Sequence, residues 1–165
     1  MRYSDAPSFE ASIDIDAPAP IVWMLVTDIN TPARFSEEFQ GAEWIDGGPA
    51  PGASFKGRNE HSAMGGWETI SYVTVYEPER HFEWAVTSVE SPTSTWWYRL
   101  EPSHDSKAPV RLTHGGRMGP APSGLSIAIK AMPDKEERIV ARRLSEWETN
   151  IHAVLEGIKN LAERQ

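Results

Sequence analysis

Large apolar and polar side chains alternate in seven stretches of the chain, and such a period of two is typical of a strand with one buried face. The stretches are residues 9–16, 42–46, 53–61, 67–76, 81–89, 94–102 and 110–114. Turn residues separate them, and Pro78 suits a tight antiparallel connection between the fourth and fifth strands. We therefore predict an antiparallel sheet whose last six strands form a meander.

Helical patterns lie before and after this run of strands. Residues 18–29 predict one short helix with its prolines in the first turn, and residues 32–39 a second with Thr31 as its cap. Residues 115–133 predict a loop carrying a short helix or strand. Asp134 and Glu137 have the spacing of a capping box, which indicates that a long helix begins there.

The long C-terminal helix has one apolar stripe and one polar face. The apolar residues of the stripe recur at intervals of three and four positions. They are Val140, Leu144, Trp147, Ile151, Val154, Leu155, Ile158 and Leu161. The face expected in solvent carries Glu136, Arg142, Arg143, Glu146, Lys159 and Glu163.

Composition narrows the possible partners and location. The 165 residues are expected to form one domain spanning 1–165, as a monomer or homodimer. The net charge of -8 disfavours nucleic acid and anionic membranes as partners. No cysteine is present, no apolar run is long enough to cross a bilayer, and the first ten residues lack a signal-peptide pattern. A cytoplasmic protein without membrane insertion is therefore expected.

The order of elements and several motifs resemble a known superfamily. The motifs are DIDAPAPIVWMLVTDI, FKGRN, the WET ahead of VTVYEPERHFEW, and PDKEERIVARRLSEWETNI. With them the chain resembles the START-like (SRPBCC, Bet v 1-like) superfamily over residues 8–163, and within it the bacterial polyketide cyclase/dehydrase and lipid-transport type. The resemblance implies an α+β helix-grip fold, in which a curved seven-stranded antiparallel sheet wraps around the long C-terminal helix and two short helices follow the first strand.

Strand parity predicts which side chains face the helix. Val75 is expected on the inner face, together with most of the residues that we predict to surround a ligand. These candidates are Trp23, Phe35, Trp44, Phe55, Asn59, His61, Trp67, Thr69, Ser71, Phe82, Trp84, Trp96, Tyr98, His114, Trp147 and Ile151. A dry core could use the same residues. The polar members would then each need a buried partner, which favours a cavity that holds ligand or water.

Candidate catalytic groups are few. His61 and His114 could move protons near neutral pH, and Tyr98 could polarise a carbonyl, although a structural role is the commoner one for a histidine. No carboxylate shares the inner face of the central strands, so none is expected to orient either imidazole. Metal binding is not expected either, because Glu148 and His152 lack a third ligand and an exposed ion pair is the simpler interpretation. No nucleotide-binding or serine-nucleophile motif is present, and no cofactor is expected.

Two functions fit these observations. The first is binding of a hydrophobic or aromatic small molecule, lipid-like or polyketide-like, between the sheet and the C-terminal helix, with residues 115–133 bordering the entrance. The second, implied by the resemblance, is a polyketide aromatase/cyclase that uses histidine, tyrosine and asparagine side chains of the cavity. A protein-interaction module would need an exposed apolar patch, which the sequence does not reveal.

Overall fold

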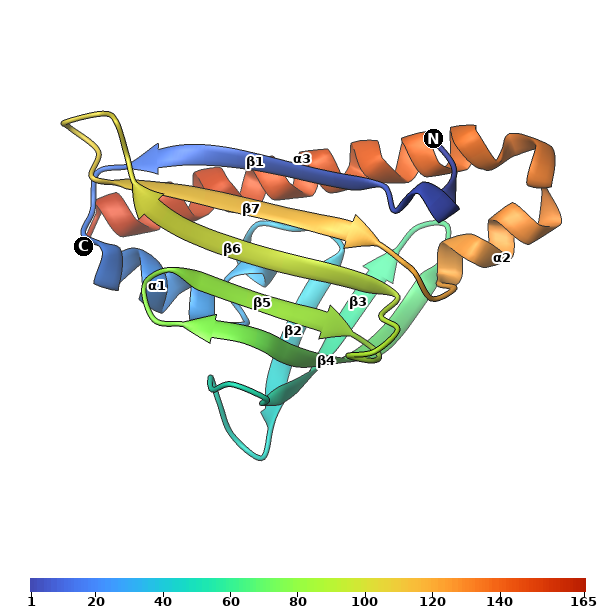
Figure 1. Cartoon of the computed structure of the whole chain (residues 1–165), viewed down its shortest axis with the longest axis horizontal. Coiled ribbons are helices and arrows are strands. Elements are labelled where there is room, and N and C mark those ends of the chain that lie inside the picture. Colours follow the sequence, from blue (N-terminus) through green and yellow to red (C-terminus); the bar gives the residue numbers. More distant parts are fainter.

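The computed structural model describes residues 1–165 and consists of a curved sheet that holds a long helix on its concave side (Figure 1). The chain passes in order through the 3₁₀ turn η1 (Tyr3–Asp5), β1 (Ser8–Ile15), α1 (Ala19–Thr27), the 3₁₀ turn η2 (Pro32–Arg34), β2 (Phe39–Ile45), β3 (Ser54–His61), β4 (Gly65–Glu77), β5 (His81–Val86), β6 (Ser94–Pro102), β7 (Val110–Met118), α2 (Gly124–Ala131), the 3₁₀ turn η3 (Pro133–Lys135) and α3 (Glu136–Glu163).

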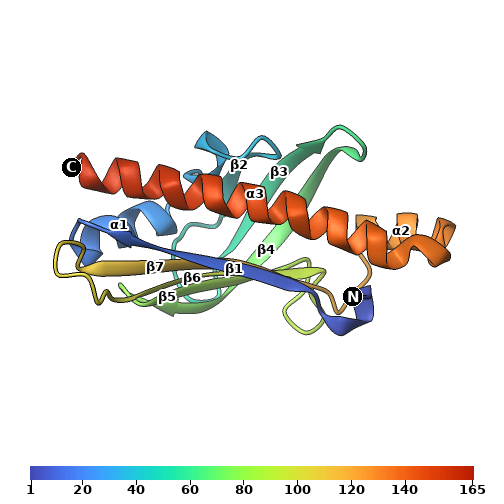
Figure 2. The same ribbon diagram turned by 90° about the horizontal axis from the view of Figure 1, so that it is seen from above.

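The seven strands lie in the order β1-β7-β6-β5-β4-β3-β2, and every neighbouring pair is antiparallel. Strands β2 to β7 follow one another as a meander, and β1 returns to pair with β7. The predicted helix-grip fold is therefore confirmed. Figure 2 shows α3 lying along the sheet above β1, while β2 and β3 turn upward beyond it.

Helix α3 runs for 28 residues, about 42 Å at the rise of an α-helix. Its predicted apolar stripe faces inward, and Val140, Ile151 and Ile158 are almost completely buried. The predicted capping box is wrong, because Asp134 belongs to η3 and the helix begins at Glu136 without a side-chain cap. No helix of the chain combines the length and apolar character needed to cross a bilayer.

The predicted second short helix is a single 3₁₀ turn, Pro32–Arg34. Phe35 leaves the helical conformation, with φ -128° and ψ -23°, and its ring packs against the backbone of α3 at Gly157. A Cβ atom placed on Gly157 would lie 2.5 Å from three atoms of that ring. The packing of the Phe35 ring on α3, where Gly157 has no side chain, thus ends the helical conformation of residues 32–34 at Phe35.

Strand β7 extends four residues beyond the predicted end, through Gly115 and Gly116 to Met118. Two indoles of β6 lie close against these glycines, since a Cβ atom on Gly115 would lie 2.7 Å from the Trp97 ring and one on Gly116 would lie 2.7 Å from the Trp96 ring. The sequence predicted that these glycines lie in a loop. In the structure they belong to a strand, and their lack of side chains lets the two indoles pack against the backbone.

A β-bulge in β4 overturns one prediction of parity. The register shifts between Val73 and Val75, so that Val75 pairs with the outward-facing Glu83 and Tyr76 pairs with Phe82. Tyr76 therefore takes the inner position that was predicted for Val75, and its ring packs 6.2 Å from that of Phe82.

The contact between Phe35 and Gly157 predicts a stability change of unusual sign. Glycine-to-alanine substitution inside a helix normally stabilises by about 1 kcal/mol. We expect Gly157→Ala instead to lower the free energy of unfolding by about 1–3 kcal/mol, because the added methyl group overlaps the Phe35 ring. Urea denaturation measures the change.

Gly124→Ala is the matched control, since a Cβ atom there meets only the Met64 sulfur at 3.8 Å. Gly124→Ala should be neutral or stabilising. If Gly157→Ala were equally benign, the packing of Phe35 on α3 would be wrong.

Candidate functional site

A cavity of about 770 Å³ lies between the concave face of the sheet and helices α2 and α3. Twenty of its 35 lining residues are hydrophobic, as is typical of pockets that bind small organic molecules. Most of the side chains predicted to surround a ligand line it. These are Phe55, Asn59, Trp67, Thr69, Ser71, Phe82, Trp84, Trp96, Tyr98, His114, Trp147 and Ile151.

The strand register explains why these side chains share one face. Residues paired across antiparallel strands point to the same side of a sheet. Asn59 pairs with Trp67, Phe55 with Ser71, Trp84 with Trp96, and Tyr98 with His114. The inner residues therefore form continuous rows from β3 to β7. Helix α3 closes the cavity from above, where Trp147 packs 4.4 Å from Trp96 between ring centroids.

Four of the predicted ligand-contacting residues, Trp23, Phe35, Trp44 and His61, do not line the cavity. Trp23 packs with Tyr76 and Phe82, at centroid distances of 5.5 and 6.4 Å, and so belongs to an aromatic cluster under α1. The ring of Phe35 is taken up by its contact with α3.

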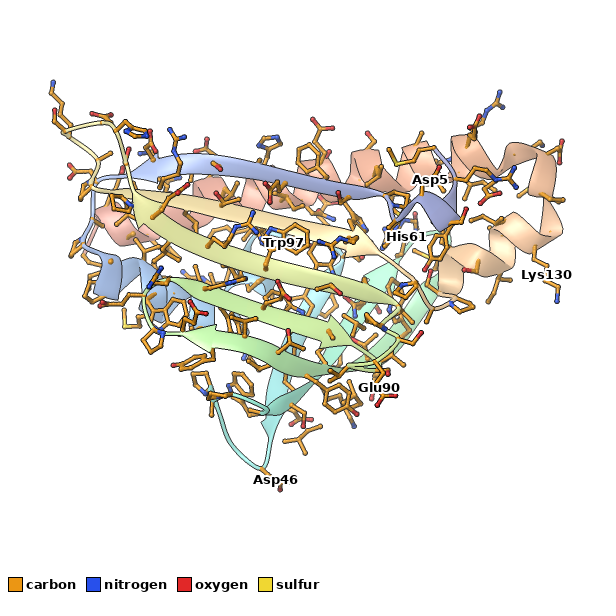
Figure 3. All side chains as sticks on the ribbon, viewed as in Figure 1. Asp5, Asp46, His61, Glu90, Trp97 and Lys130 are labelled. Carbon is orange, nitrogen blue, oxygen red and sulfur yellow. The ribbon has the colours of Figure 1, made fainter.

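Trp44 and His61 lie at the two ends of the β2–β3 region. Trp44 does face inward, but the backbone of Gly48 covers its indole and Phe55 packs on its edge at 5.4 Å. His61 is the last residue of β3, where the hairpin reaches α3 (Figure 3). Parity predicted the face of both residues, but it carries no information about how far along the strands the cavity extends.

Helix α2 supplies a wall that the site prediction lacked. Its lining residues are Gly124, Leu125, Ile127, Ala128 and Ala131, preceded by Ser123. The sequence predicted only that residues 115–133 border the entrance. The apolar spacing of Leu125, Ile129 and Met132 is the signal that could have identified the helix.

The rings of His114 and Tyr98 are stacked, with centroids 4.1 Å apart and planes 10° apart. The Nδ1 of His114 lies 3.0 Å from the carbonyl oxygen of Trp97, which can only accept, so Nδ1 carries a proton and donates it. Burial lowers the pKa of His114 to about 4, although the bond to Trp97 acts in the opposite direction. At neutral pH the ring is therefore uncharged, with an unprotonated Nε2.

Tyr98 is buried, and its hydroxyl has no hydrogen-bond partner within the chain. Burial raises the pKa of Tyr98 well above its ordinary value, so the phenol stays protonated. The stacked pair thus combines a neutral donor, Tyr98 Oη, with a neutral acceptor, His114 Nε2. An uncharged hydroxyl or keto group is the kind of partner that both can satisfy.

Both ring nitrogens of His61 are used by hydrogen bonds outside the cavity. Its Nδ1 accepts from the backbone N–H of Ala63 at 3.0 Å, and Nε2 bonds to a carboxylate oxygen of Glu146 on α3. Nε2 therefore carries the proton that it donates to Glu146. This contact corrects the expectation that no carboxylate orients either imidazole, and it gives His61 a role in fastening the β3–β4 hairpin to α3.

Arg143 was expected in solvent, but its side chain is only 12 % exposed and lies in the cavity wall. Its two terminal nitrogens contact the two oxygens of Glu38 at 2.6 and 2.8 Å, and Nη1 also lies 3.4 Å from Glu146. Burial lowers the pKa of Arg143, but the hydrogen bonds and charges of Glu38 and Glu146 outweigh it and raise that pKa. The fork-shaped pairing is the geometry that arginine forms with a carboxylate.

Ligand atoms of Glu38, His61 and Glu146 lie within 4.8 Å of one another, which is close enough to hold a metal ion. The hydrogen bonds around them do not fit one. A metal bound at His61 Nε2 requires a proton on Nδ1, but Nδ1 accepts from Ala63, and Arg143 occupies both oxygens of Glu38. Glu148 and His152 were the other pair considered for a metal. The His152 ring packs against Phe9, with the ring centroids 5.7 Å apart.

Comparisons with known proteins place this geometry among similar folds. Residues 6–144 match the family described as polyketide cyclase/dehydrase and lipid transport. A polyketide-cyclase-like protein of Corynebacterium glutamicum is 34% identical, with a TM-score of 0.64 over 94% of this chain and 91% of that one. No protein with a curated description matches significantly.

Two more distant structures share the fold. The Zhui aromatase/cyclase of a Streptomyces species is 16% identical, with a TM-score of 0.63 over 96% of this chain and 94% of that one. Ara h 8.0201 is 9% identical, with a TM-score of 0.60 over 97% and 99% of the two chains. At these identities the likeness supports a common architecture and leaves the chemistry of each site to its own residues.

Burial of a neutral His114 predicts how stability depends on pH. Its folded pKa of about 4 lies below the unfolded value of 6.5, so only the unfolded chain takes up this proton as the pH falls between those values. We expect His114 to contribute a loss of about 3 kcal/mol between pH 7 and pH 4. Urea denaturation at each pH measures it as the difference between wild type and His114→Gln.

The exposed His104 provides the control, because His104→Gln should leave the pH profile of wild type unchanged. A His114→Gln profile parallel to that of wild type between pH 7 and pH 4 would contradict a buried neutral imidazole.

Proposed function

Because this chain belongs to the polyketide cyclase/dehydrase and lipid transport family, whose general role is ligand binding or cyclisation, we propose that it binds an uncharged hydrophobic or aromatic small molecule in the cavity under α3. The observation that carries the proposal is the cavity itself. Its volume of about 770 Å³ suits a molecule of several fused or linked rings, since ligand sites commonly measure about 300–1,000 Å³.

The aromatic side chains of the wall support a flat ligand. Four of the seven tryptophans line the cavity, on β4, β5, β6 and α3. They are Trp67, Trp84, Trp96 and Trp147. Tryptophan offers large rigid apolar faces, and offset or tilted stacking with a ligand ring adds to the area buried.

The electrostatics of the wall support an uncharged ligand. Arg143 is the one cationic side chain in the lining, and Glu38 neutralises it through both oxygens. Tyr98 and His114 stay neutral at pH 7 for the reasons given above. The other carboxylate of the lining, Asp28, is exposed to solvent. A charged ligand would have to leave water for an interior without a free counter-charge, which costs far more than burial of a hydroxyl or ketone.

A second candidate function is polyketide cyclisation, and the stacked Tyr98–His114 pair is the observation that favours it. In an aldol closure, His114 Nε2 would take a proton from a carbon between two ketones, and that carbon would bond to the carbonyl carbon of a further ketone. The oxygen of that ketone would receive a proton from Tyr98, so the proton gained by His114 balances the one lost by Tyr98. The protonated His114 would then give its proton to the new hydroxyl as that leaves as water, while the Tyr98 phenolate takes a hydrogen from the neighbouring carbon, which restores both side chains. Enolisation of the remaining ketones would give the aromatic ring.

Ligand binding is favoured over cyclisation because His114 is a weak base. General base catalysis is most effective when the pKa of the base lies near the working pH, and burial lowers the pKa of His114 to about 4. A hydrogen bond to a ligand needs only the lone pair on Nε2. The same geometry therefore suits recognition of a hydroxyl or ketone better than rapid proton abstraction.

Filling part of the cavity should weaken ligand binding. Titration of wild type with planar polyketides, flavonoids, sterols and fatty acids is expected to give saturable changes in tryptophan fluorescence for at least one neutral planar compound, because four tryptophans border the site. Thr69→Phe adds a ring to the wall and should weaken that binding by about tenfold or more. Thr74→Phe, on the same strand but exposed, should bind like wild type. Absence of saturable binding by every class of compound would refute the proposal.

The cyclase alternative makes a separate prediction. With a synthetic poly-β-ketone, wild type should accelerate formation of one cyclised product, followed by chromatography, and Tyr98→Phe should slow it by about 100-fold or more through loss of the proton donor. Product yields equal to those without protein would exclude cyclisation of that compound and leave the binding proposal intact.

A further inference from the structure

An apolar tip stands at one end of the molecule. Ile127 is 74 % exposed, Met132 is 40 % exposed and Met64 is 39 % exposed. The first lies on α2, the second follows that helix, and the third lies in the β3–β4 turn. We call these three residues the apolar tip. In both Figure 1 and Figure 2, α2 and the start of α3 extend past the ends of the strands at this end.

The apolar tip borders the mouth of the cavity. Met64 and Ile127 are both lining residues, and the Met64 sulfur lies 3.8 Å from the point where a Cβ atom of Gly124 would be. The β3–β4 turn and α2 therefore meet across the entrance. Exposed apolar groups at such a place cost free energy in water and commonly mark a surface that another apolar phase covers.

The segment from α2 to the second turn of α3 differs in charge sign from the rest of the chain. Residues 124–143 carry five basic and three acidic side chains, a net charge of +2 in a chain of net charge -8, which leaves -10 for the remainder. Two of the three acids are neutralised, since Glu136 pairs with Arg2 and Glu137 with the N-terminal ammonium group.

Four cations of this segment form no salt bridge, and we call them the basic rim. They are Lys130, Lys135, Arg138 and Arg142, all on or beside α2 and the first two turns of α3. Figure 3 shows Lys130 pointing away from the sheet at this end. Apolar residues at the tip of a helix with cations beside them are the pattern of a segment that rests in the interface of an anionic bilayer.

We propose that this end of the molecule docks reversibly on an anionic lipid surface, with the apolar tip entering the headgroup region and the basic rim contacting lipid phosphates. Docking in this orientation turns the cavity mouth toward the bilayer. An apolar ligand could then pass between membrane and cavity without crossing water. The proposal extends beyond ligand binding in the cavity, and vesicle binding can be measured whether or not a ligand is known.

The shape of this end favours a bilayer over a protein partner. The apolar residues occupy a projecting helix and turn, a convex feature that can enter a soft interface, whereas protein interfaces bury broad and closely fitting patches. The acidic remainder of the chain repels anionic lipid, so only this end can approach. Binding should therefore weaken sharply with salt.

Co-sedimentation with lipid vesicles tests the docking. The full chain is mixed with sucrose-loaded vesicles of equal parts phosphatidylglycerol and phosphatidylcholine, or of phosphatidylcholine alone, in low salt and in about 0.5 M salt. We expect apparent affinity for the anionic vesicles in low salt to exceed that for neutral vesicles by about tenfold or more, and to fall toward the neutral value in high salt.

Matched variants locate the contact. Ile127→Asp and the double variant Lys130→Glu/Lys135→Glu should each lower the affinity by about tenfold or more. Met24→Asp changes a residue of α1 that is 53 % exposed at the opposite end, and Arg80→Glu/Lys107→Glu makes the same charge change in exposed loops there. Both controls should retain most of the binding, and circular dichroism checks that every variant is folded.

Three results would overturn the proposal. The first is binding by Ile127→Asp equal to that of wild type, and the second is an equal loss of binding in Ile127→Asp and Met24→Asp. The third is no vesicle binding by wild type at any salt concentration, which would leave this end as a surface for an acidic protein. None of these results bears on the fluorescence titration, so failure of docking and failure of ligand binding remain distinguishable.

Discussion

The attachment of α3 to one side of the sheet is the constraint from which the rest of the structure follows. The helix packs along β1 and β7, and the sheet turns away from it toward β4, β3 and β2. One apolar stripe of a single helix cannot fill the concave face of so curved a sheet. The aromatic side chains of β3 to β6 narrow the remaining space, and α2 closes part of its end. The cavity is thus a geometric result of gripping a long helix at one edge.

Charge is arranged in layers around that space. Inside, Tyr98 and His114 are neutral because burial shifts both pKa values away from the charged forms. At the wall, Arg143 and Glu38 cancel each other's charge and join α3 to the segment before β2. Farther out, the surface carries the basic rim on and beside α2 and the start of α3, and a net negative charge over the remainder of the chain. A molecule that enters therefore passes from a charged surface, through a compensated wall, to an interior where only dipoles remain.

Local pattern predicted much of the fold and part of the site. Alternation placed the strands, and parity gave the inner rows from Phe55 to His114, because both depend on neighbours within a strand. The bulge in β4 could not be read, since no glycine or proline marks it. The contacts of His61 with Glu146 and of Arg143 with Glu38 join residues 85 and 105 positions apart, so they depend on how the helix lies over the sheet. Trp44 and Phe35 do not line the cavity, because Gly48 and Gly157 let their rings pack closely against the backbone.

The bulge in β4 separates two tasks along one strand. Before it, Trp67, Thr69 and Ser71 shape the space offered to a ligand, while after it the inner residue is Tyr76, which packs with Trp23 in the solid core under α1. A change of side chain before the bulge alters the shape of the cavity, and a change after it alters the core. Selectivity and folding stability can therefore drift independently during evolution within a single thirteen-residue strand.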